Sequence, residues 1–237
     1  MPAFEGGPSP HRWNQIKKLP LNPGIHSLQQ YEDAVLAGTV DALAFLRRIP
    51  VLRELAVADI QQVHYQIFKG VHPWAGQFRR WGQVATVGGL PTADAQRIGR
   101  ELEVALFQTR ELLEAVLPAP DPHSVLAAMA FFHVRFERVH PFLDGNGRSG
   151  RTILSVQIES GFGVAPEFTD QRGYRDAMRA SARRDLAPLI NYIGASVGVP
   201  SVTTPWPAPF QVSPRFLEEI MGNPTFEEDL AWSRMGC

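Results

Sequence analysis

Residues 140–151 read His-Pro-Phe-Leu-Asp-Gly-Asn-Gly-Arg-Ser-Gly-Arg, which places a histidine, a carboxylate and two arginines within twelve positions. Pro141 disfavours helical geometry at the residue before it, so a helix arriving from the N-terminal side should end near His140. The glycines allow a tight loop whose backbone N–H groups face inward, and a new helix should begin near Gly147. The stretch therefore predicts a helix, an anion-binding loop and a second helix in direct succession.

The side chains of this stretch fit a polyphosphate that carries a metal ion. Arg148 and Arg151 are three residues apart, so they share one face of the second helix and can clamp phosphate oxygens. Asp144 is a hard oxygen ligand suited to Mg²⁺, which normally accompanies a triphosphate. His140 can take a proton from an attacking hydroxyl near neutral pH. The residues expected from this chemistry to bind the polyphosphate are Gly145, Gly147, Arg148 and Arg151.

The same stretch resembles the Fic family motif, H-P-F-x-[D/E]-G-N-G-R-x-x-R, at all nine specified positions. The resemblance implies that His140 activates a hydroxyl of a target protein and that Asp144 holds Mg²⁺. By the same resemblance, the phosphates of ATP are held by the G-N-G turn and both arginines, which are Gly145, Asn146, Gly147, Arg148 and Arg151. It also implies an enzyme that transfers AMP from ATP to a Ser, Thr or Tyr hydroxyl, as most members with the complete motif do. The toxin of a toxin–antitoxin pair is one setting for this activity.

Other activities stay open within this resemblance. Phosphoryl transfer is disfavoured, since Doc-like toxins of the same superfamily have lysine at the position of Gly147. Transfer of UMP or phosphocholine is compatible with the motif, because nothing in it reads the base. A module that binds nucleotide or a partner without turnover is disfavoured by the intact His140 and Asp144, since degraded members usually lose one or both.

The composition is that of one globular domain with additional arms. The chain has 237 residues, of which 44% are hydrophobic and 10% aromatic, and this suffices for a core. The net charge of −1 gives no reason to expect nucleic acid or a membrane surface as a partner. The single cysteine, Cys237, excludes an intramolecular disulfide and fits a reducing cytosol, either the cell's own or that of a host. The N-terminal residues lack the features of a signal peptide.

A short β-hairpin is expected where Val84-Ala85-Thr86-Val87 is followed by Gly88-Gly89. The preceding residues 74–79, Trp-Ala-Gly-Gln-Phe-Arg, resemble the W-A-G-x-x-R segment before the substrate flap of many Fic proteins. The resemblance implies that residues 84–88 form a flap that pairs with the backbone of the target protein, which would require little of the target sequence. Without the motif, an ordinary surface hairpin would be the better interpretation.

The remaining pattern predicts an all-α fold, a Fic-type helical bundle with that one small hairpin. Apolar residues recur at helical spacing in several segments and place His133 on a core helix rather than in a site. The helices are expected at residues 28–48 (with a possible break near Gly38), 57–70, 92–116, 124–139, 147–160, 171–184 and 186–197. The domains are then an irregular N-terminal arm (1–27), a Fic domain (28–197) and a proline-rich tail (198–237) with a short helix at 214–221.

The sequence also allows a prediction of how the enzyme's activity is inhibited. Many Fic proteins carry a Ser/Thr-x-x-x-Glu-Gly/Asn segment whose glutamate pairs with the second motif arginine, here Arg151. Only Ser155 has a glutamate four residues later, and Glu159 lies about 12 Å along the helix from Arg151 at 1.5 Å per residue. We therefore expect no built-in inhibitory helix of this pattern, and a small antitoxin that supplies the glutamate is one expected partner, beside the target protein.

Overall fold

The computed structural model describes residues 10–80, 83, 86–87, 90–116, 121–182 and 185–206. Within these ranges the chain forms α-helices, a single 3₁₀ turn and one pair of short strands, so the predicted all-α fold with a small hairpin is confirmed. The helices are α1 (Pro10–Ile16), α2 (Leu28–Leu46), α3 (Val57–Phe68), α4 (Ile98–Val116), α5 (Pro122–Val139), α6 (Asn146–Phe162), α7 (Gln171–Ser181) and α8 (Ala187–Ser196). The 3₁₀ turn η1 is Ala95–Arg97, and the strands are β1 (Thr86–Val87) and β2 (Leu90–Pro91).

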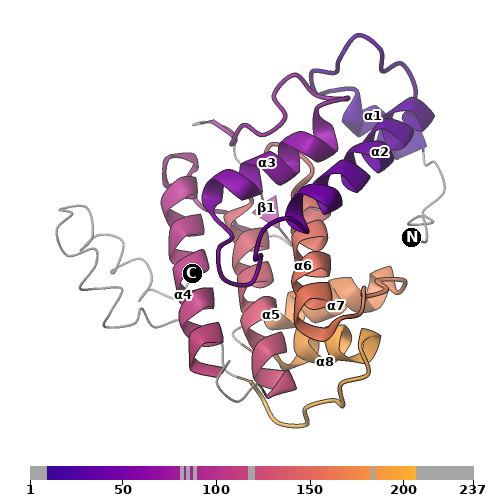
Figure 1. The fold of residues 1–237 in the computed structure, drawn as a ribbon. Coiled ribbons are helices and arrows are strands. Elements are labelled where there is room, and N and C mark those ends of the chain that lie inside the picture. Colours follow the sequence, from indigo (N-terminus) through magenta and orange to yellow (C-terminus); the bar gives the residue numbers. More distant parts are fainter. Residues whose placement is uncertain are drawn as a thin grey trace, which may run out of the picture.

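Helix α5 is the centre of the bundle. It packs against α4 on one side, α6 on the other and α8 near its N-terminal half, while α2 packs on α3 and both reach α6 (Figure 1). The aromatic residues of α5 face two clusters: Phe132 and Phe136 pack with α2 and α3, and Phe131 packs with α7 and α8. Because α5 is buried on nearly every side, its C-terminal end is a rigid place to hold a functional residue.

Gly38 does not break α2, so the possible helix break that the sequence analysis placed near this residue is wrong. The helix runs unbroken from Leu28 to Leu46, and Gly38 lies where it crosses α3. A Cβ at this position would overlap the backbone carbonyl oxygens of Gln66 and Ile67. The glycine therefore serves close approach of two helices rather than a change of chain direction.

The irregular N-terminal arm was predicted wrongly for residues 10–16, which form α1. Pro10 is the first residue of that helix, where its missing N–H costs no hydrogen bond. Ile16 at the other end is buried in the core, and Trp13 packs against it. Proline-rich composition therefore does not exclude a short packed helix here.

The expected boundary at residue 197 is not a break in packing. Asn191 on α8 donates to the Val202 carbonyl at 3.0 Å and accepts from the Val202 N–H at 2.7 Å. The Leu186 N–H donates to the Trp206 carbonyl at 2.8 Å. Residues 198–206 thus belong to the packed domain, whereas the short helix predicted at 214–221 lies outside the described residues.

The other helices begin and end within a few residues of the predicted positions, except that α4 starts at Ile98 rather than Thr92. Residues 90–97 are used by β2 and η1, and the Asp94 side chain accepts from the Gln96 N–H at 2.9 Å. Among the described helices, none combines the length and apolar character needed to cross a bilayer.

Candidate active site

His140 lies directly after the last turn of α5, as Pro141 predicted. Its backbone is left-handed (φ 51°, ψ 61°), and its N–H donates to the Phe136 carbonyl at 3.0 Å. Burial lowers the pKa of His140, an effect partly offset by the nearby Glu137 backbone. Nδ1 is buried and makes no hydrogen bond of standard geometry with the described residues. A neutral imidazole at pH 7 is the form that can accept a proton.

The loop between α5 and α6 turns at Gly145, which has φ 83° and is the N-cap of α6. A Cβ here would overlap the ring of Phe68, the last residue of α3, so this position requires glycine for both conformation and packing. The N–H groups of Arg148 and Ser149 bond to the Gly145 carbonyl, while those of the first two residues of α6 precede the helical ladder. The N–H groups of Asn146 and Gly147, with the helix dipole, have the arrangement that favours an anion, and the sequence predicts that nucleotide phosphates bind here.

Asn146 has a different role from the one expected. Its side chain is 2% exposed, accepts from the Phe142 N–H at 2.8 Å and donates to the Phe142 carbonyl at 2.8 Å. Both ends of the amide therefore close the loop on itself rather than face a ligand. The predicted contact between this side chain and phosphate is not supported by the geometry, because the amide is used within the loop.

Asp144 and Arg148 meet on either side of Tyr31, which α2 supplies. The Tyr31 hydroxyl donates to Asp144 Oδ2 at 3.3 Å and accepts from Arg148 Nη1 at 3.1 Å. The Arg148 guanidinium also lies 5.3 Å from the centre of the Tyr31 ring and 5.9 Å from that of Phe68. The tyrosine thus fixes the predicted metal ligand, Asp144, relative to Arg148, which the sequence predicts to bind phosphate.

Arg151 lies one turn after Arg148 on α6, near the buried pair Tyr174 and His133. Its guanidinium is 5.5 Å from the centre of the Tyr174 ring, and the Tyr174 hydroxyl is 2.6 Å from His133 Nε2. Burial lowers the pKa of His133 to about 3, so this histidine is neutral, in agreement with its predicted core position. Burial also raises the pKa of Glu137 to about 7, although the charge of Arg151 opposes that rise.

His64 on α3 holds the loop between α5 and α6 through hydrogen bonds and ring stacking. Its Nδ1 accepts from the Gly76 N–H at 2.9 Å, so Nε2 carries the hydrogen and donates to the Asp144 carbonyl at 3.0 Å. The ring stacks on Phe142 with centroids 3.8 Å apart, and burial lowers its pKa to about 3. His64 is therefore a neutral structural residue that joins the residue 69–80 loop to the motif.

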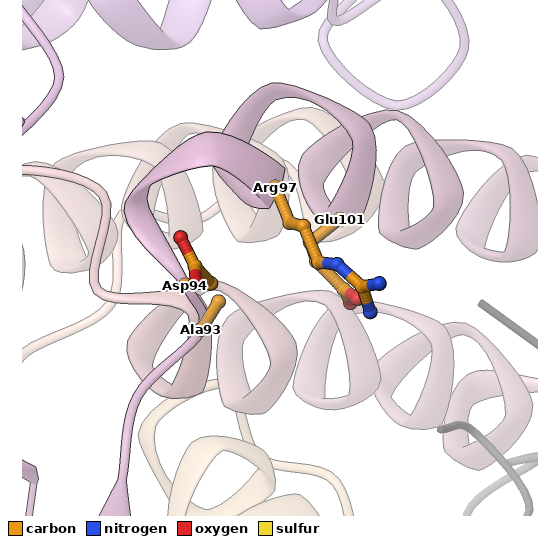
Figure 2. A pocket seen from close by; sticks show the side chains of 4 residues that line it. All are labelled: Ala93, Asp94, Arg97 and Glu101. Atoms are coloured by element: carbon orange, nitrogen blue, oxygen red, sulfur yellow. The ribbon is translucent and has the colours of Figure 1, made fainter. Parts of the chain in front are cut away.

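The predicted flap is described only in part. Thr86 and Val87 pair antiparallel with Pro91 and Leu90, which supports a hairpin, whereas Val84, Ala85 and Gly88 lie outside the described residues. Beside β2 lies a pocket of about 310 Å³. Figure 2 shows the four side chains that line it: Ala93 and Asp94 from the segment before η1, Arg97 from η1 and Glu101 from α4. No motif residue lines this pocket, so it is separate from the anion site.

Comparison with known proteins identifies the domain. Residues 54–158 match the Fic/DOC family, and this range includes α3, the hairpin, α4, α5 and the whole motif. The chain carries a Fic domain. Among solved structures, a Fic domain containing signaling protein from Bacteroides thetaiotaomicron superposes with a TM-score of 0.57 at 17% identity, over 74% of this chain and 72% of that one. BepC of Bartonella tribocorum, solved with AMPPNP bound, gives a TM-score of 0.54 at 18% identity, over 75% and 91%.

Two curated relatives of the Fic domain are adenylyltransferases by name. The protein adenylyltransferase Fic of Nematostella vectensis is 24% identical over 72% of this chain, which spans only 39% of that relative's length. A probable protein adenylyltransferase of Sinorhizobium fredii is 26% identical over 75% of this chain and 95% of its own length. The relatives thus agree on one class of activity, and some of them are much longer than this chain.

The structure brings the predicted motif residues together around the end of α5 and the start of α6. Sequence reasoning missed Tyr31, His64 and Arg79, which support the loop from α2, α3 and the loop after α3. The two former residues lie more than 70 positions before the motif and follow ordinary helical patterns, so no local signal distinguishes them. Arg79 is the arginine of the W-A-G-x-x-R segment, and that resemblance was the available signal.

Proposed function

We propose that this Fic domain is a protein adenylyltransferase that transfers AMP from ATP to a Ser, Thr or Tyr hydroxyl of a target protein. The observation that carries the proposal is the position of His140, a histidine with a lowered pKa that ends α5 five residues before Gly145, the N-cap of α6. A base and an anion site in that arrangement fit the attack of a hydroxyl on a phosphate.

In the proposed reaction the target hydroxyl attacks the α-phosphorus of ATP in line, and the bond to pyrophosphate breaks. Because Nδ1 of His140 is buried, Nε2 is the nitrogen that takes the hydroxyl proton. The backbone N–H groups at Gly145 and Gly147 bind phosphate oxygens, and Arg148 and Arg151 bind the β- and γ-phosphates. Asn146 acts indirectly by holding the loop closed.

A divalent cation fits the donor set at Asp144. Oδ2 of this carboxylate is positioned by Tyr31, and hard oxygen ligands suit Mg²⁺, which commonly binds through one or two carboxylates together with phosphates and water. The described residues offer no group of three or more His, Cys, Asp or Glu side chains that could hold a metal alone. When bound with ATP, Mg²⁺ would offset charge on the phosphates.

ATP is the proposed co-substrate because the matched curated relatives are named adenylyltransferases and BepC was solved with AMPPNP, an ATP analogue. Gly147 favours transfer of AMP over phosphoryl transfer, as the sequence motif indicated. A Cβ at this position would lie 3.0 Å from Arg151 Nη1, so a larger residue would crowd the arginine proposed to bind the γ-phosphate.

The test is an incubation of the purified protein with a cell lysate and ATP labelled at either the α- or the γ-phosphate. Label from the α-phosphate should appear on protein, and label from the γ-phosphate should not. Protein labelled from the γ-position alone would indicate phosphoryl transfer and contradict the proposal. Absence of protein labelling from both positions, with ATP binding retained, would indicate a binding module.

The proposed partners are a target protein with a surface hydroxyl and a small antitoxin that supplies an inhibitory glutamate. The antitoxin is proposed because the internal candidate is occupied elsewhere: Glu159 Oε2 accepts from Arg47 Nη2 at 2.9 Å and from Arg47 Nε at 3.1 Å. A cytoplasmic location, or delivery into a host cytosol, is proposed with this function.

A further inference from the structure

Arg79 joins the hairpin to the end of α5. It lies in the loop after α3, is only 5% exposed, and its side chain donates to five acceptors. Two of these belong to the end of α5, where Nε donates to the His140 carbonyl at 2.8 Å and Nη2 to the Val139 carbonyl at 3.2 Å. The other three flank the hairpin, and they are the Gln83 carbonyl at 3.2 Å, the Thr92 hydroxyl at 3.2 Å and the Ala93 carbonyl.

All five acceptors of Arg79 are neutral. The charge is therefore solvated by carbonyl dipoles and one hydroxyl, although Asp94 lies near enough to oppose the lowering of the Arg79 pKa by burial. A hydrogen bond to a charged group typically contributes more stability than one between neutral groups. The planar guanidinium fork donates in several directions at once, which a lysine ammonium on a flexible stem cannot reproduce.

His140 needs such support because of its backbone. It is the one non-glycine residue with positive φ among those the structure describes. The left-handed conformation is unfavourable for an L-residue that carries a Cβ, so surrounding contacts must hold it. Arg79 provides them on both sides of the strained residue: its guanidinium binds the carbonyls of Val139 and His140, and its own N–H donates to the Pro141 carbonyl at 2.9 Å.

We propose that Arg79 is a positioning residue that ties both ends of the hairpin to the carbonyls of Val139 and His140 and thereby holds the histidine in its left-handed conformation. This inference rests on the proposed function, in which the hairpin docks the target protein. The segment that docks the target then also positions His140, the general base. Movement of the hairpin is transmitted to His140 through one guanidinium, and loss of the tie impairs transfer without removing any group that contacts ATP.

The matched variants are Arg79→Met, Arg79→Lys and, as a control, Arg135→Met. Arg79→Met removes the donors and the charge, whereas Arg79→Lys keeps the charge and loses the fork. Arg135 on α5 is also largely buried, and it pairs with Glu101 of α4 at 2.9 Å rather than with the carbonyls that Arg79 binds. Its replacement therefore reproduces the loss of a buried arginine without touching the base.

The first readout is independent of catalysis: titration of the His140 ring by NMR, with His140→Ala used for assignment. Among the charges near His140, Arg79 lowers its pKa and Asp144 raises it. Arg79→Met should raise the His140 pKa and shift its ring signals, whereas Arg135→Met should leave both as in the wild type. A folded Arg79→Met protein with unchanged His140 signals would overturn the proposal, whether or not the protein transfers AMP.

The second readout is transfer from α-labelled ATP to lysate proteins. Both Arg79 variants should lose about 10²-fold in rate at saturating ATP, as expected for a misplaced catalytic group, with the KM for ATP unchanged. Wild-type activity in Arg79→Lys would show that charge alone matters and would overturn the role of the fork. Loss of ATP affinity equal to the loss of rate would assign Arg79 to nucleotide binding instead, again against the proposal.

A measurement on the wild-type protein covers the case in which the variants do not fold. The Nε–H of Arg79 should give a sharp NMR signal that exchanges slowly with solvent, because it donates to the His140 carbonyl within the core. Rapid exchange, like that of a free arginine, would contradict the tie. Binding of AMPPNP alone should leave this signal in place, since the tie does not involve the phosphate site.

Discussion

The loop geometry gives its sharpest prediction at Gly145. In Gly145→Ala the new methyl group meets two penalties that the structure separates. The left-handed φ of 83° costs an L-residue about 1–2 kcal/mol. Overlap with the Phe68 ring adds an overpacking cost of about 1–3 kcal/mol, so the total loss in the free energy of unfolding is about 2–5 kcal/mol.

Gly163→Ala is the matched control for this change. Gly163 caps the other end of the same helix with φ 71°, and a Cβ there would meet nothing within 4 Å. It should therefore lose only the conformational term, about 1–2 kcal/mol. Urea unfolding followed by circular dichroism measures both variants, and Gly145→Ala should be the less stable by about 1–3 kcal/mol.

A double variant tests whether the steric part of the destabilisation comes from the Phe68 ring. Phe68→Leu removes the ring atoms that the new methyl group would overlap, so combining it with Gly145→Ala should recover part of the loss in a double-mutant cycle. Equal destabilisation by Gly145→Ala and Gly163→Ala, or strict additivity with Phe68→Leu, would refute the claim that α3 packs against the turn of the anion loop.

Three further changes address the site and its surroundings. Asp144→Ala should weaken Mg²⁺-dependent labelling, and excess Mg²⁺ should restore it only partly; an unchanged dependence on Mg²⁺ would place the metal elsewhere. Replacing Val84 and Val87 by proline should reduce labelling of target proteins more than ATP binding, because proline removes N–H groups that a docked strand needs; equal losses would argue against a flap. Burial raises the pKa of Glu137 to about 7, so the folded state favours the protonated carboxyl. Its contribution to stability is therefore fully present below the ordinary pKa of a glutamate and is lost as the pH rises through 7. Glu137→Gln should therefore increase the free energy of unfolding at pH 8 and change it little at pH 4; the same effect at both values would contradict the shift.

The order of the elements was readable because the signals are local. Pro141 ends α5, Gly145 begins α6, and apolar residues recur at helical spacing in each predicted helix. Errors arose where one residue type serves two purposes. Gly38 marked a helix crossing rather than a break, and Pro10 began a helix within a segment that composition had classified as irregular.

The motif predicted which residues gather at the site but not how each is used. Asn146 carries an amide that could bind phosphate, and only the fold shows that both of its ends close the loop on Phe142. Tyr31 and Arg79 reach the motif from distant positions, and long-range contacts of this kind leave no periodic trace in a single sequence. The pKa values of His64 and His133 likewise depend on burial created by the tertiary structure.

The most direct test of the central claim compares wild type and His140→Ala in two assays on the same preparations: labelling of protein by α-labelled ATP, and binding of AMPPNP. Removal of a general base should lower the labelling rate by about 10²–10⁴-fold, while AMPPNP binds nearly as well because the anion site at α6 is intact. Near-wild-type labelling by a folded His140→Ala protein would show that the base lies elsewhere and would contradict the account.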